Sequence, residues 1–587
     1  MLRFFQEHRA AKWAPIFGEN SVKSNIRRNR NDSRIAHLAF VTVALLASQS
    51  ALAQPPVDAG SQIRQIPPAP APLKTAPVIE LAPPAAAAPA ETGPAGSSVR
   101  VEAVRITGAT LFPESALVAA SGIRPGQQMN LADLRRAAAN ISRYYNERGY
   151  FLARAYLPDQ NVERGTVTIA VLEGRYGAIR LDNHSHLSDS VARRTLGGLD
   201  SGDIVATAPL ERRLLLLSDI PGIALKSTLA PGSAVGTSDL IVDVASGRAV
   251  TGSVEADNAG NRYTGAYRAG GTINFNDLAG IGDLVSLRVL ASTSGLAYGR
   301  AAVQAPIGNL TLGIAYAHFR YDLGREFESL EAHGTADVGS LYASYPLIRS
   351  RDFNLYALAG VDANWFHDRI DLVSGRSDKK SQVASFGLRG DSHDRFGGGG
   401  WNVYSASWAI GNLDLQSPLD RAADAVTARS DGGFSKIDFS VARLQTLSGP
   451  LSLYAAVRGQ LAFENLDSSE KMELGGAYGV RAYPEGEAYG DQGYIATAEA
   501  RLALRPAALP GQLQLFGFLD TGEVRYAHSP WFATSNHARR SGYGAGLAWF
   551  APANVMIKAT YARRLGDPAT SAPDHSGRFW FQISKSF

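Results

Sequence analysis

The last segment of the chain, Ser576-Gly-Arg-Phe-Trp-Phe-Gln-Ile-Ser-Lys-Ser-Phe587, indicates how most of the protein folds. Successive side chains of a strand point to opposite faces. One face therefore carries Phe579, Phe581, Ile583 and Phe587, and the other carries Arg578, Gln582, Ser584 and Ser586. One apolar and one polar face are typical of a strand in a transmembrane barrel, which meets lipid outside and water inside.

The same kind of segment recurs upstream. Sixteen candidate strands follow residue 249, and most reach the roughly 9–11 residues that a tilted strand needs to cross a bilayer. They are 250–258, 263–275, 283–293, 296–306, 310–321, 335–347, 353–366, 381–393, 400–411, 434–446, 450–463, 493–505, 512–523, 541–550, 553–564 and 576–587. Short turns alternate with long loops near 322–334, 367–380, 412–433 and 464–492. We therefore predict a 16-stranded antiparallel transmembrane β-barrel over 248–587.

A soluble β-sandwich is the alternative, but it would bury polar strand faces that contain Arg458 and Lys558, at roughly several kcal/mol for each unpaired charge. The composition also favours a barrel, because 45% of residues are hydrophobic while the mean hydropathy is only −0.10. The chain has no cysteine, which excludes disulfides and thiolate metal sites. The net charge of +4 comes without a basic stripe, so we expect no nucleic-acid partner. No catalytic or metal-binding pattern occurs, so we expect no enzyme, cofactor or metal.

Before the barrel, the N-terminal part shows three kinds of sequence. Residues 1–53 are predicted to be a signal peptide, because arginines precede the apolar run 35–47 and Ala51-Leu52-Ala53 fits signal-peptidase cleavage. Residues 54–98 are rich in Pro and Ala and are predicted to be an extended linker, with room for one or two helical turns at 58–66. Residues 99–175 and 176–247 each follow the order β-α-α-β-β, which indicates a tandem repeat.

Three segments then carry more specific patterns. Arg154–Gln160 and Gly165–Gly174 end the first module. Gly479-Val480-Arg481-Ala482-Tyr483-Pro484 lies in the long loop between the eleventh and twelfth strands, and Gly517-Phe518-Leu519-Asp520-Thr521-Gly522 lies on the thirteenth strand. They resemble, in this order, the end of the first POTRA domain, the V-R-G-[YF] motif and the F-x-D motif of outer-membrane transporters of two-partner secretion. These haemolysin and filamentous haemagglutinin secretion-activation proteins belong to the Omp85 superfamily.

The resemblance implies a role for the loop motif, Val480 to Tyr483, and the wall motif, Phe518 and Asp520. Alternation places Asp520 on the lumen face of its strand, and the resemblance implies that Arg481 reaches it from the loop. A guanidinium forms charge-assisted, bidentate bonds with a carboxylate, which would pin the loop. Tyr483 and Phe518 are expected to pack beside the pair. Ala482 stands where the superfamily has Gly, which requires a negative φ.

The resemblance also implies a function and its partners. The predicted protein is a Gram-negative outer-membrane translocase that binds an unfolded partner exoprotein, such as an adhesin or haemolysin, through periplasmic POTRA domains and exports it through the barrel. Strand addition would bind this client, with candidate contacts at Leu134, Tyr145, Ile223 and Leu229. Relatives can carry a plug helix, for which residues 58–66 are the candidate. Outer-membrane lipid and the barrel-assembly machinery, for which the aromatic C-terminus is suited, are further expected partners.

Two other functions remain open from the sequence. An assembly factor that inserts other outer-membrane proteins would have a similar barrel, but such factors usually carry three or more POTRA domains. A substrate-specific diffusion porin would lack the N-terminal modules and the two motifs.

Overall fold

A computed structural model of the chain describes residues 57–67, 78–81, 98–162 and 164–587. The predicted signal peptide and most of the predicted linker lie outside these residues. Within the described ranges, no helix combines the length and the apolar character needed to cross a membrane.

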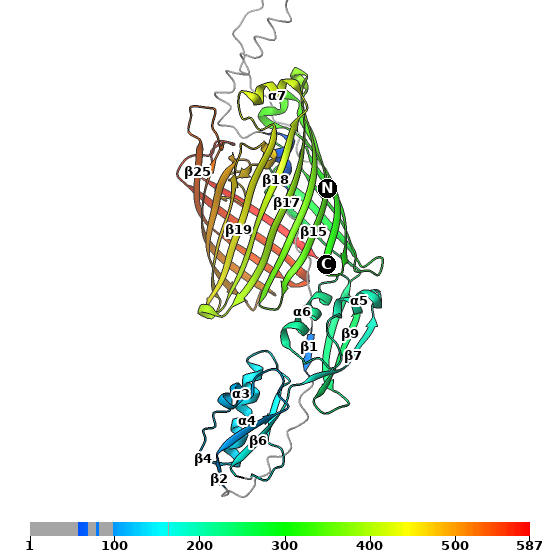
Figure 1. Cartoon of the computed structure of the whole chain (residues 1–587). Coiled ribbons are helices and arrows are strands. Elements are labelled where there is room, and N and C mark those ends of the chain that lie inside the picture. Colours follow the sequence, from blue (N-terminus) through cyan, green and yellow to red (C-terminus); the bar gives the residue numbers. More distant parts are fainter. Residues whose placement is uncertain (1–56, 68–77, 82–97, 163) are drawn as a thin grey trace, which may run out of the picture. The chain divides into compact units, whose positions relative to one another are not determined.

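Residues from 250 onward form a closed antiparallel barrel of sixteen strands (Figure 1), as predicted. The strands are β10 Val250–Asp257, β11 Arg268–Asn276, β12 Leu284–Ser292, β13 Leu296–Ile307, β14 Leu310–Asp322, β15 Ala332–Arg349, β16 Phe353–Ile370, β17 Gly375–Asp394, β18 Gly400–Leu415, β19 Gly432–Ser448, β20 Leu451–Ala462, β23 Gln492–Leu504, β24 Gln512–Arg525, β25 His537–Ala551, β26 Val555–Leu565 and β27 Gly577–Ser586. β27 closes the barrel against β10, where Ser586 pairs with Ser253. Phe587 extends this closure through two backbone hydrogen bonds with Gly252.

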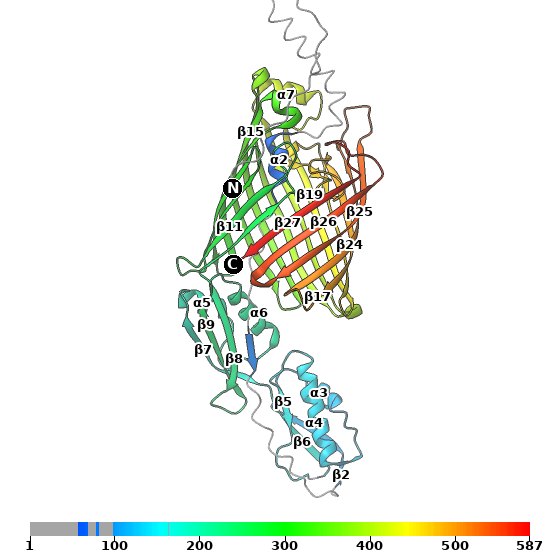
Figure 2. The same cartoon turned by 180° about the vertical axis from the view of Figure 1, so that it is seen from behind.

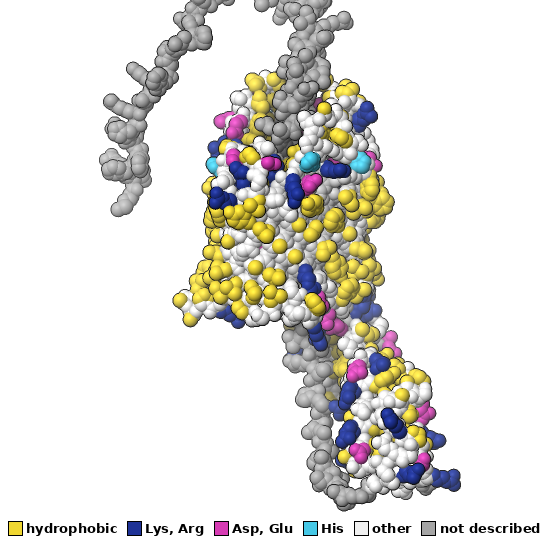
Figure 3. Space-filling view, turned by 90° about the vertical axis from the view of Figure 1, so that its left-hand side faces the viewer, with side chains coloured by type: hydrophobic (Ala, Val, Ile, Leu, Met, Phe, Trp, Pro, Cys, Tyr) yellow, Lys and Arg dark blue, Asp and Glu magenta, His cyan; other side chains and the backbone are white. Residues whose placement is uncertain are grey.

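The two faces of the wall differ in the way that the alternation predicts. On β24, Leu515 and Leu519 are 38% and 59% exposed on the outside, whereas Phe518 and Asp520 between and beside them are buried on the inside. Figure 3 shows the outer surface as a band of apolar side chains, with Lys and Arg side chains concentrated above and below it. This distribution suits a wall that meets lipid across its middle and water at its ends.

Short and long connections lie at opposite ends of the barrel, which we call the turn end and the loop end. The loop end carries η1 Arg325–Leu330, η2 Asp371–Val373, α7 Pro418–Ala425, and η4 Ser468–Glu470 with the small hairpin β21 Met472–Glu473 and β22 Tyr489–Gly490. The turn end carries η3 Phe396–Gly398 and η5 Pro552–Asn554. The predicted loop at 367–380 was wrong, because β16 and β17 continue to pair as far as Ile370 and Gly375. Polar pairs such as His367 with Asp378 stabilise this extension.

The first N-terminal module contains β2 Ser98–Val101, β3 Ala103–Thr107, α3 Glu114–Ser121, β4 Gln127–Asn130, α4 Leu131–Asn146, β5 Arg154–Tyr156 and β6 Thr166–Leu172. The predicted first strand is divided into β2 and β3, because β2 pairs with β4 while β3 pairs with β6. A capping box of Asn130 and Asp133 begins α4, whose apolar face packs on the sheet.

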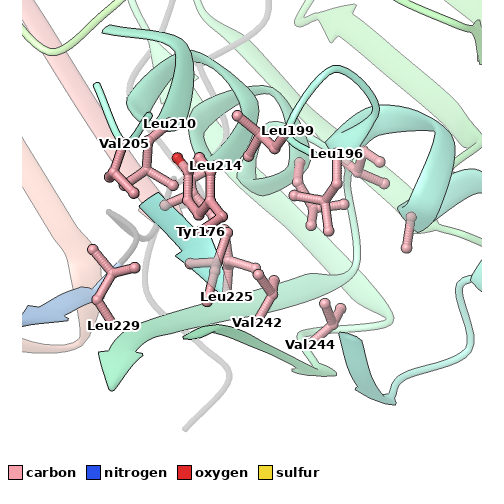
Figure 4. Packing of buried hydrophobic residues seen from close by; sticks show 14 of the residues in the cluster. Tyr176, Leu196, Leu199, Val205, Leu210, Leu214, Leu225, Leu229, Val242 and Val244 are labelled. Atoms are coloured by element: carbon pink, nitrogen blue, oxygen red, sulfur yellow. The ribbon is translucent and has the colours of Figure 1, made fainter. Parts of the chain in front are cut away.

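The second module follows the predicted order, with β7 Arg175–His184, α5 Asp189–Leu196, α6 Thr207–Ser218, β8 Ile223–Pro231 and β9 Thr237–Ser246. Figure 4 shows how leucines of the helices, among them Leu196, Leu210 and Leu214, pack on Leu225 and Val242 of the sheet. The linker supplies an additional strand, β1 Val78–Leu81, which pairs in parallel with β8. The sheet order is therefore β1-β8-β9-β7, and β1 occupies the edge that β8 would otherwise expose.

A short helix from the linker, α2 Ala59–Arg64, lies within the barrel near the loop end (Figure 2). Asp58 caps its N-terminus by accepting a hydrogen bond from the backbone N–H of Ser61. The helix packs against β14, β15 and β16 on one side and η4 on the other. The lumen thus holds both a helix from the N-terminal linker and the longest loop of the barrel.

Candidate functional site

The connection between β20 and β23, residues 463–491, folds back into the barrel, and we call it the lumen loop. Its hairpin β21/β22 pairs Met472 with Gly490. Lys471 forms an ion pair with Asp491 and donates a hydrogen bond to the backbone carbonyl of Tyr526 (2.7 Å). The base of the loop is therefore attached to the segment that follows β24.

At the tip, Arg481 contacts Asp520 in the bidentate geometry expected of the two motifs. Nε donates to Oδ2 (2.8 Å) and Nη2 donates to Oδ1 (2.7 Å), while the backbone N–H of Arg481 also donates to Oδ2 (3.2 Å). Both residues are buried. Burial alone would lower the pKa of Arg481, but the facing carboxylates raise it above its ordinary value. Removing one partner of such a buried pair costs about 3–5 kcal/mol, because the other charge is left uncompensated.

Arg481 makes three further contacts, of which only the one with Phe518 was expected from the sequence. Its Nη1 donates to Glu499 of β23 (2.7 Å), and its guanidinium lies 3.5 Å from the centre of the Phe518 ring. Trp580 of β27 donates its indole N–H to the backbone carbonyl of Arg481 (2.7 Å). The alternation of β23 does place Glu499 on the lumen face, but only the closed barrel shows that this face lies opposite the loop tip.

The other motif residues pack around the pair. Val480 and Tyr483 are fully buried, and the Tyr483 hydroxyl donates to the backbone carbonyl of Asp567 (2.8 Å). Arg540 lies 5.3 Å from the Tyr483 ring and pairs with Glu487 of the loop (2.8 Å). Ala482 does not adopt a positive φ, so alanine is accommodated there. Its methyl group packs so closely on Gly542 that a side chain at Gly542 would collide with it.

A second buried ion pair holds α2 in the lumen. Lys379 of β17 donates to Asp58 (2.8 Å), to both carboxylate oxygens of Asp467 (2.9 Å each) and to Ser468 (3.1 Å). Burial alone would raise the pKa of Asp58, but Lys379, Ser468 and the backbone N–H of Ser61 hold it at about 2. One ammonium group therefore joins the barrel wall, the lumen helix and the lumen loop.

The remaining contacts of α2 include an apolar one, in which Ala59 and Ile63 pack against the wall cluster around Phe319, and several polar ones. The N–H of Ala59 donates to Asp368 (2.9 Å), Thr264 donates to Gln62 (3.1 Å), and Gln65 hydrogen-bonds Tyr489 of the lumen loop. Gly60 approaches Ser469 so closely that a Cβ would lie 2.8 Å from the Cβ of Ser469. Beside the C-terminal end of the helix is a cavity of about 550 Å³. Its lining includes Arg64, Arg458, Glu473, Tyr478 and Glu485.

The candidate client contacts in the N-terminal modules need correction. Leu134 and Tyr145 belong to the core of the first module, and Leu229 to that of the second. Each is at most 7% exposed, so a client cannot reach these side chains in the folded modules. Ile223 is half-buried at the start of β8 and packs against the same core as Leu229. The apolar side chains of these segments therefore mark the interior of each module rather than a surface for the client.

A closed sixteen-stranded barrel with an occupied lumen, an Arg481–Asp520 lock and two small α+β modules before it defines a protein-translocating barrel of the Omp85 type. The family model of the haemolysin secretion/activation protein ShlB/FhaC/HecB matches residues 236–549, and the ShlB-type POTRA domain matches residues 99–174. The chain belongs to this ShlB/FhaC/HecB family of two-partner secretion transporters, whose members act in the outer membrane on a secreted partner protein.

Individual relatives agree with this assignment. The chain is 28% identical over 476 residues to the heme/hemopexin transporter protein HuxB of Haemophilus influenzae strain 86-028NP, covering 79% of this chain and 82% of the relative. It is 23% identical over 411 residues to the outer membrane transporter CdiB of Dickeya dadantii, covering 68% and 71%. It is 25% identical to the hemolysin transporter protein ShlB of Serratia marcescens, covering 47% of each chain.

Solved structures show the same fold at low sequence identity. CdiB from Escherichia coli superposes with a TM-score of 0.67 at 19% identity, covering 85% of this chain and 92% of that one. CdiB from Acinetobacter baumannii gives a TM-score of 0.59 at 19% identity, covering 96% and 100%. BamA from Haemophilus ducreyi lacking POTRA domains 1–3 gives 0.50 at 16% identity, covering 83% and 100%.

Proposed function

We propose that this transporter recognises its unfolded client in the periplasm, at the edge strand β8, and that recognition is coupled to clearing the lumen of α2. The observation that carries this proposal is that two parts of the linker lie in two different places. Its first part, α2, fills the lumen, and its second part, β1, covers β8. A client strand can pair with β8 only after β1 has left, because one strand edge accepts one neighbour.

Departure of α2 requires the exchange of polar contacts and the loss of a small apolar contact made by Ala59 and Ile63. The helix is short and is held by the Lys379 cluster and a few hydrogen bonds rather than by a large apolar surface. Thirteen residues, 65–77, connect α2 to β1. Displacing β1 therefore removes an anchor that is close to the helix along the chain. We propose that the Arg481–Asp520 lock keeps the lumen loop in place while α2 leaves.

The remaining parts of the proposal concern location and chemistry. The N-terminal modules work in the periplasm, the barrel lies in outer-membrane lipid, and the barrel-assembly machinery inserts it using the aromatic C-terminal strand. Export proceeds without catalysis by this chain, and within the described residues no cluster of ligands suited to a metal ion is present. The client is an unfolded secreted partner protein, such as an adhesin or haemolysin.

A disulfide between β1 and β8 tests the coupling. Glu80 and Thr228 are register partners, and the chain contains no natural cysteine, so Glu80→Cys with Thr228→Cys introduces a single reversible link. In cells that also produce the secreted partner protein, we expect oxidation to stop secretion and a reducing agent to restore it. The two single-cysteine variants serve as controls. Secretion that continues at the normal rate while the link is intact would contradict the proposed client site.

A further inference from the structure

Three arginines point away from the barrel at the loop end of adjacent strands. Arg525 ends β24 on the face of Leu515 and Leu519, which is the outer face. Arg539 of β25 precedes the buried Arg540 and therefore lies outside, and Arg563 of β26 lies outside because Ala562 is fully buried. We call these three residues the arginine patch.

The protein supplies no partner to the arginine patch. In the parts of the chain that the structure describes, none of the three side chains forms an ion pair or a hydrogen bond, whereas their inward neighbours Arg540 and Arg564 pair with Glu487 and Asp574 (2.8 Å each). Glu523 is the one acidic residue on the outer face of these three strands. It is opposite Arg539 in the ladder without forming an ion pair, so the patch keeps a net positive charge.

The other side of the barrel shows that pairing is available at this level. On the outer face of β14 to β17, Arg320 contacts Asp322 (3.3 Å), His318 contacts Asp337 (2.8 Å) and His367 contacts Asp378 (2.7 Å). Arg376 also contacts Asp378. These four basic side chains each have a carboxylate of the protein itself, which the arginine patch lacks.

Aromatic side chains lie on the same outer face as the patch. Tyr543, Tyr561 and Phe579 are 42%, 53% and 56% exposed on β25, β26 and β27. Tyrosines at the rim of a transmembrane barrel sit at the level of the lipid headgroups. Figure 3 shows Lys and Arg side chains collected just above the apolar band on this side of the barrel. The arginine patch therefore lies where the phosphates of outer-leaflet lipids are found.

We propose that Arg525, Arg539 and Arg563 form a binding site for a phosphorylated lipid of the outer leaflet, with at least two phosphates engaged. A guanidinium binds phosphate through two parallel charge-assisted hydrogen bonds, which is stronger than its contact with water. Arg525 is diagonal to Arg539, at about 7–8 Å. Arg563 is opposite Tyr543, four residues from Arg539 and so about 13 Å along the strand. These separations between the three arginines suit a glucosamine disaccharide with a phosphate at each end better than a single phosphodiester.

This site goes beyond the proposed export function, because it involves neither the lumen nor the N-terminal modules. It would orient the barrel in an asymmetric membrane and stabilise the wall formed by β24 to β26. Its success or failure is independent of how the client is recognised.

Native mass spectrometry of the full chain tests the site. Detergent-solubilised protein is incubated with bisphosphorylated lipid A, with the same lipid after removal of both phosphates, and with excess inorganic phosphate. We expect a bound bisphosphorylated lipid that survives activation, and about tenfold weaker binding of the dephosphorylated lipid. Equal retention of the two lipids, or binding of free phosphate without a preference for the lipid, would overturn the proposal. This comparison needs no variant and so cannot fail through misfolding.

Variants then locate the site. The triple substitution Arg525→Ala, Arg539→Ala and Arg563→Ala should weaken retention of bisphosphorylated lipid A by at least about tenfold, whereas replacing all three by Lys should keep part of it. Arg320→Ala, at the loop end of β14, is the matched control and should leave retention unchanged. Heat-dependent migration in gels shows that each barrel is folded. A folded triple variant that retains the lipid as the wild type does would exclude the arginine patch.

Discussion

The lumen contains two occupants that are held in different ways. The tip of the lumen loop is fixed by Arg481 against two carboxylates, Asp520 and Glu499, within an apolar cluster that includes Val480, Tyr483 and Phe518. The six-residue helix α2 contributes only Ala59 and Ile63 to an apolar cluster of the wall, and Asp58 at its N-terminus pairs with Lys379. A large apolar cluster combined with a bidentate pair resists displacement, whereas a short helix with a small apolar contact loses less on leaving. The comparison indicates a permanent loop and a removable helix.

The largest expected effect follows from removing the anchor of the loop. Arg481→Ala leaves Asp520 buried without its cation, while Glu499 keeps only Arg501, and this costs the docked loop about 3–5 kcal/mol. We expect secretion of the partner to fall sharply, by at least about tenfold, while the barrel remains inserted. A secretion assay measures this fall, and the amount of transporter in the outer membrane is quantified in parallel. Arg481→Lys keeps the charge but loses the bidentate geometry and should be intermediate. Normal secretion by Arg481→Ala would show that the loop needs no lock.

A smaller effect is expected for the helix. Asp58→Asn removes both one of the two carboxylate partners of Lys379 and the charge of the N-cap, which together are worth about 1–3 kcal/mol. The helix should leave the lumen more often, and the mean conductance of the barrel in planar lipid bilayers should rise. Asp322→Asn, on the outer face of β14, is the control because it lies away from the helix. An unchanged conductance in Asp58→Asn would show that α2 does not block the pore.

The response to pH distinguishes the two occupants further. Burial and repulsion from Glu485 raise the pKa of Glu473 well above its ordinary value, although Arg458 opposes the shift. Burial also raises the pKa of Glu485, although Arg268 and Arg458 oppose it. The folded loop thus favours the protonated form, so this contribution to its stability is complete below the ordinary carboxyl pKa. It is lost as the pH rises through the raised values. Limited proteolysis of the loop should accelerate as the pH is raised above the ordinary carboxyl pKa, and Glu473→Gln should remove that dependence.

Asp58 changes stability in the opposite sense. Its lowered pKa means that its contribution to helix docking is present above the ordinary carboxyl pKa and is lost only as the pH falls towards about 2. As the pH rises above the ordinary carboxyl pKa, docking of the helix should therefore be insensitive while the loop becomes more accessible. Equal acceleration of proteolysis at both elements would contradict this assignment of the titrating groups.

The sequence predicted those features that depend on local alternation. The strand count, the lumen position of Asp520 and the two motifs all follow from the period of two and from short patterns. The partners that close the site come from remote strands. Glu499, Lys379 and Trp580 become neighbours of the loop or helix only when the barrel closes. The pairing of β1 with β8 was also missed, because four residues in a Pro- and Ala-rich linker carry no pattern that specifies an edge.

The smallest expected effect concerns the departure from the family motif at Ala482. The backbone of Ala482 is not left-handed, so Ala482→Gly relieves no strain in the docked loop. Glycine gives the undocked loop more conformational freedom, which disfavours docking by about 0.4–1 kcal/mol. The substitution also removes a methyl group that packs on Gly542. We expect slightly faster proteolysis of the loop, measured under mild denaturant, with secretion close to normal.

The reciprocal change, Gly542→Ala, introduces a collision with Ala482 and should impair loop docking more than Ala482→Gly does. If Ala482→Gly instead protected the loop, alanine would be a strained residue at this position, and the loop tip would favour the backbone conformation that the glycine of the family motif permits.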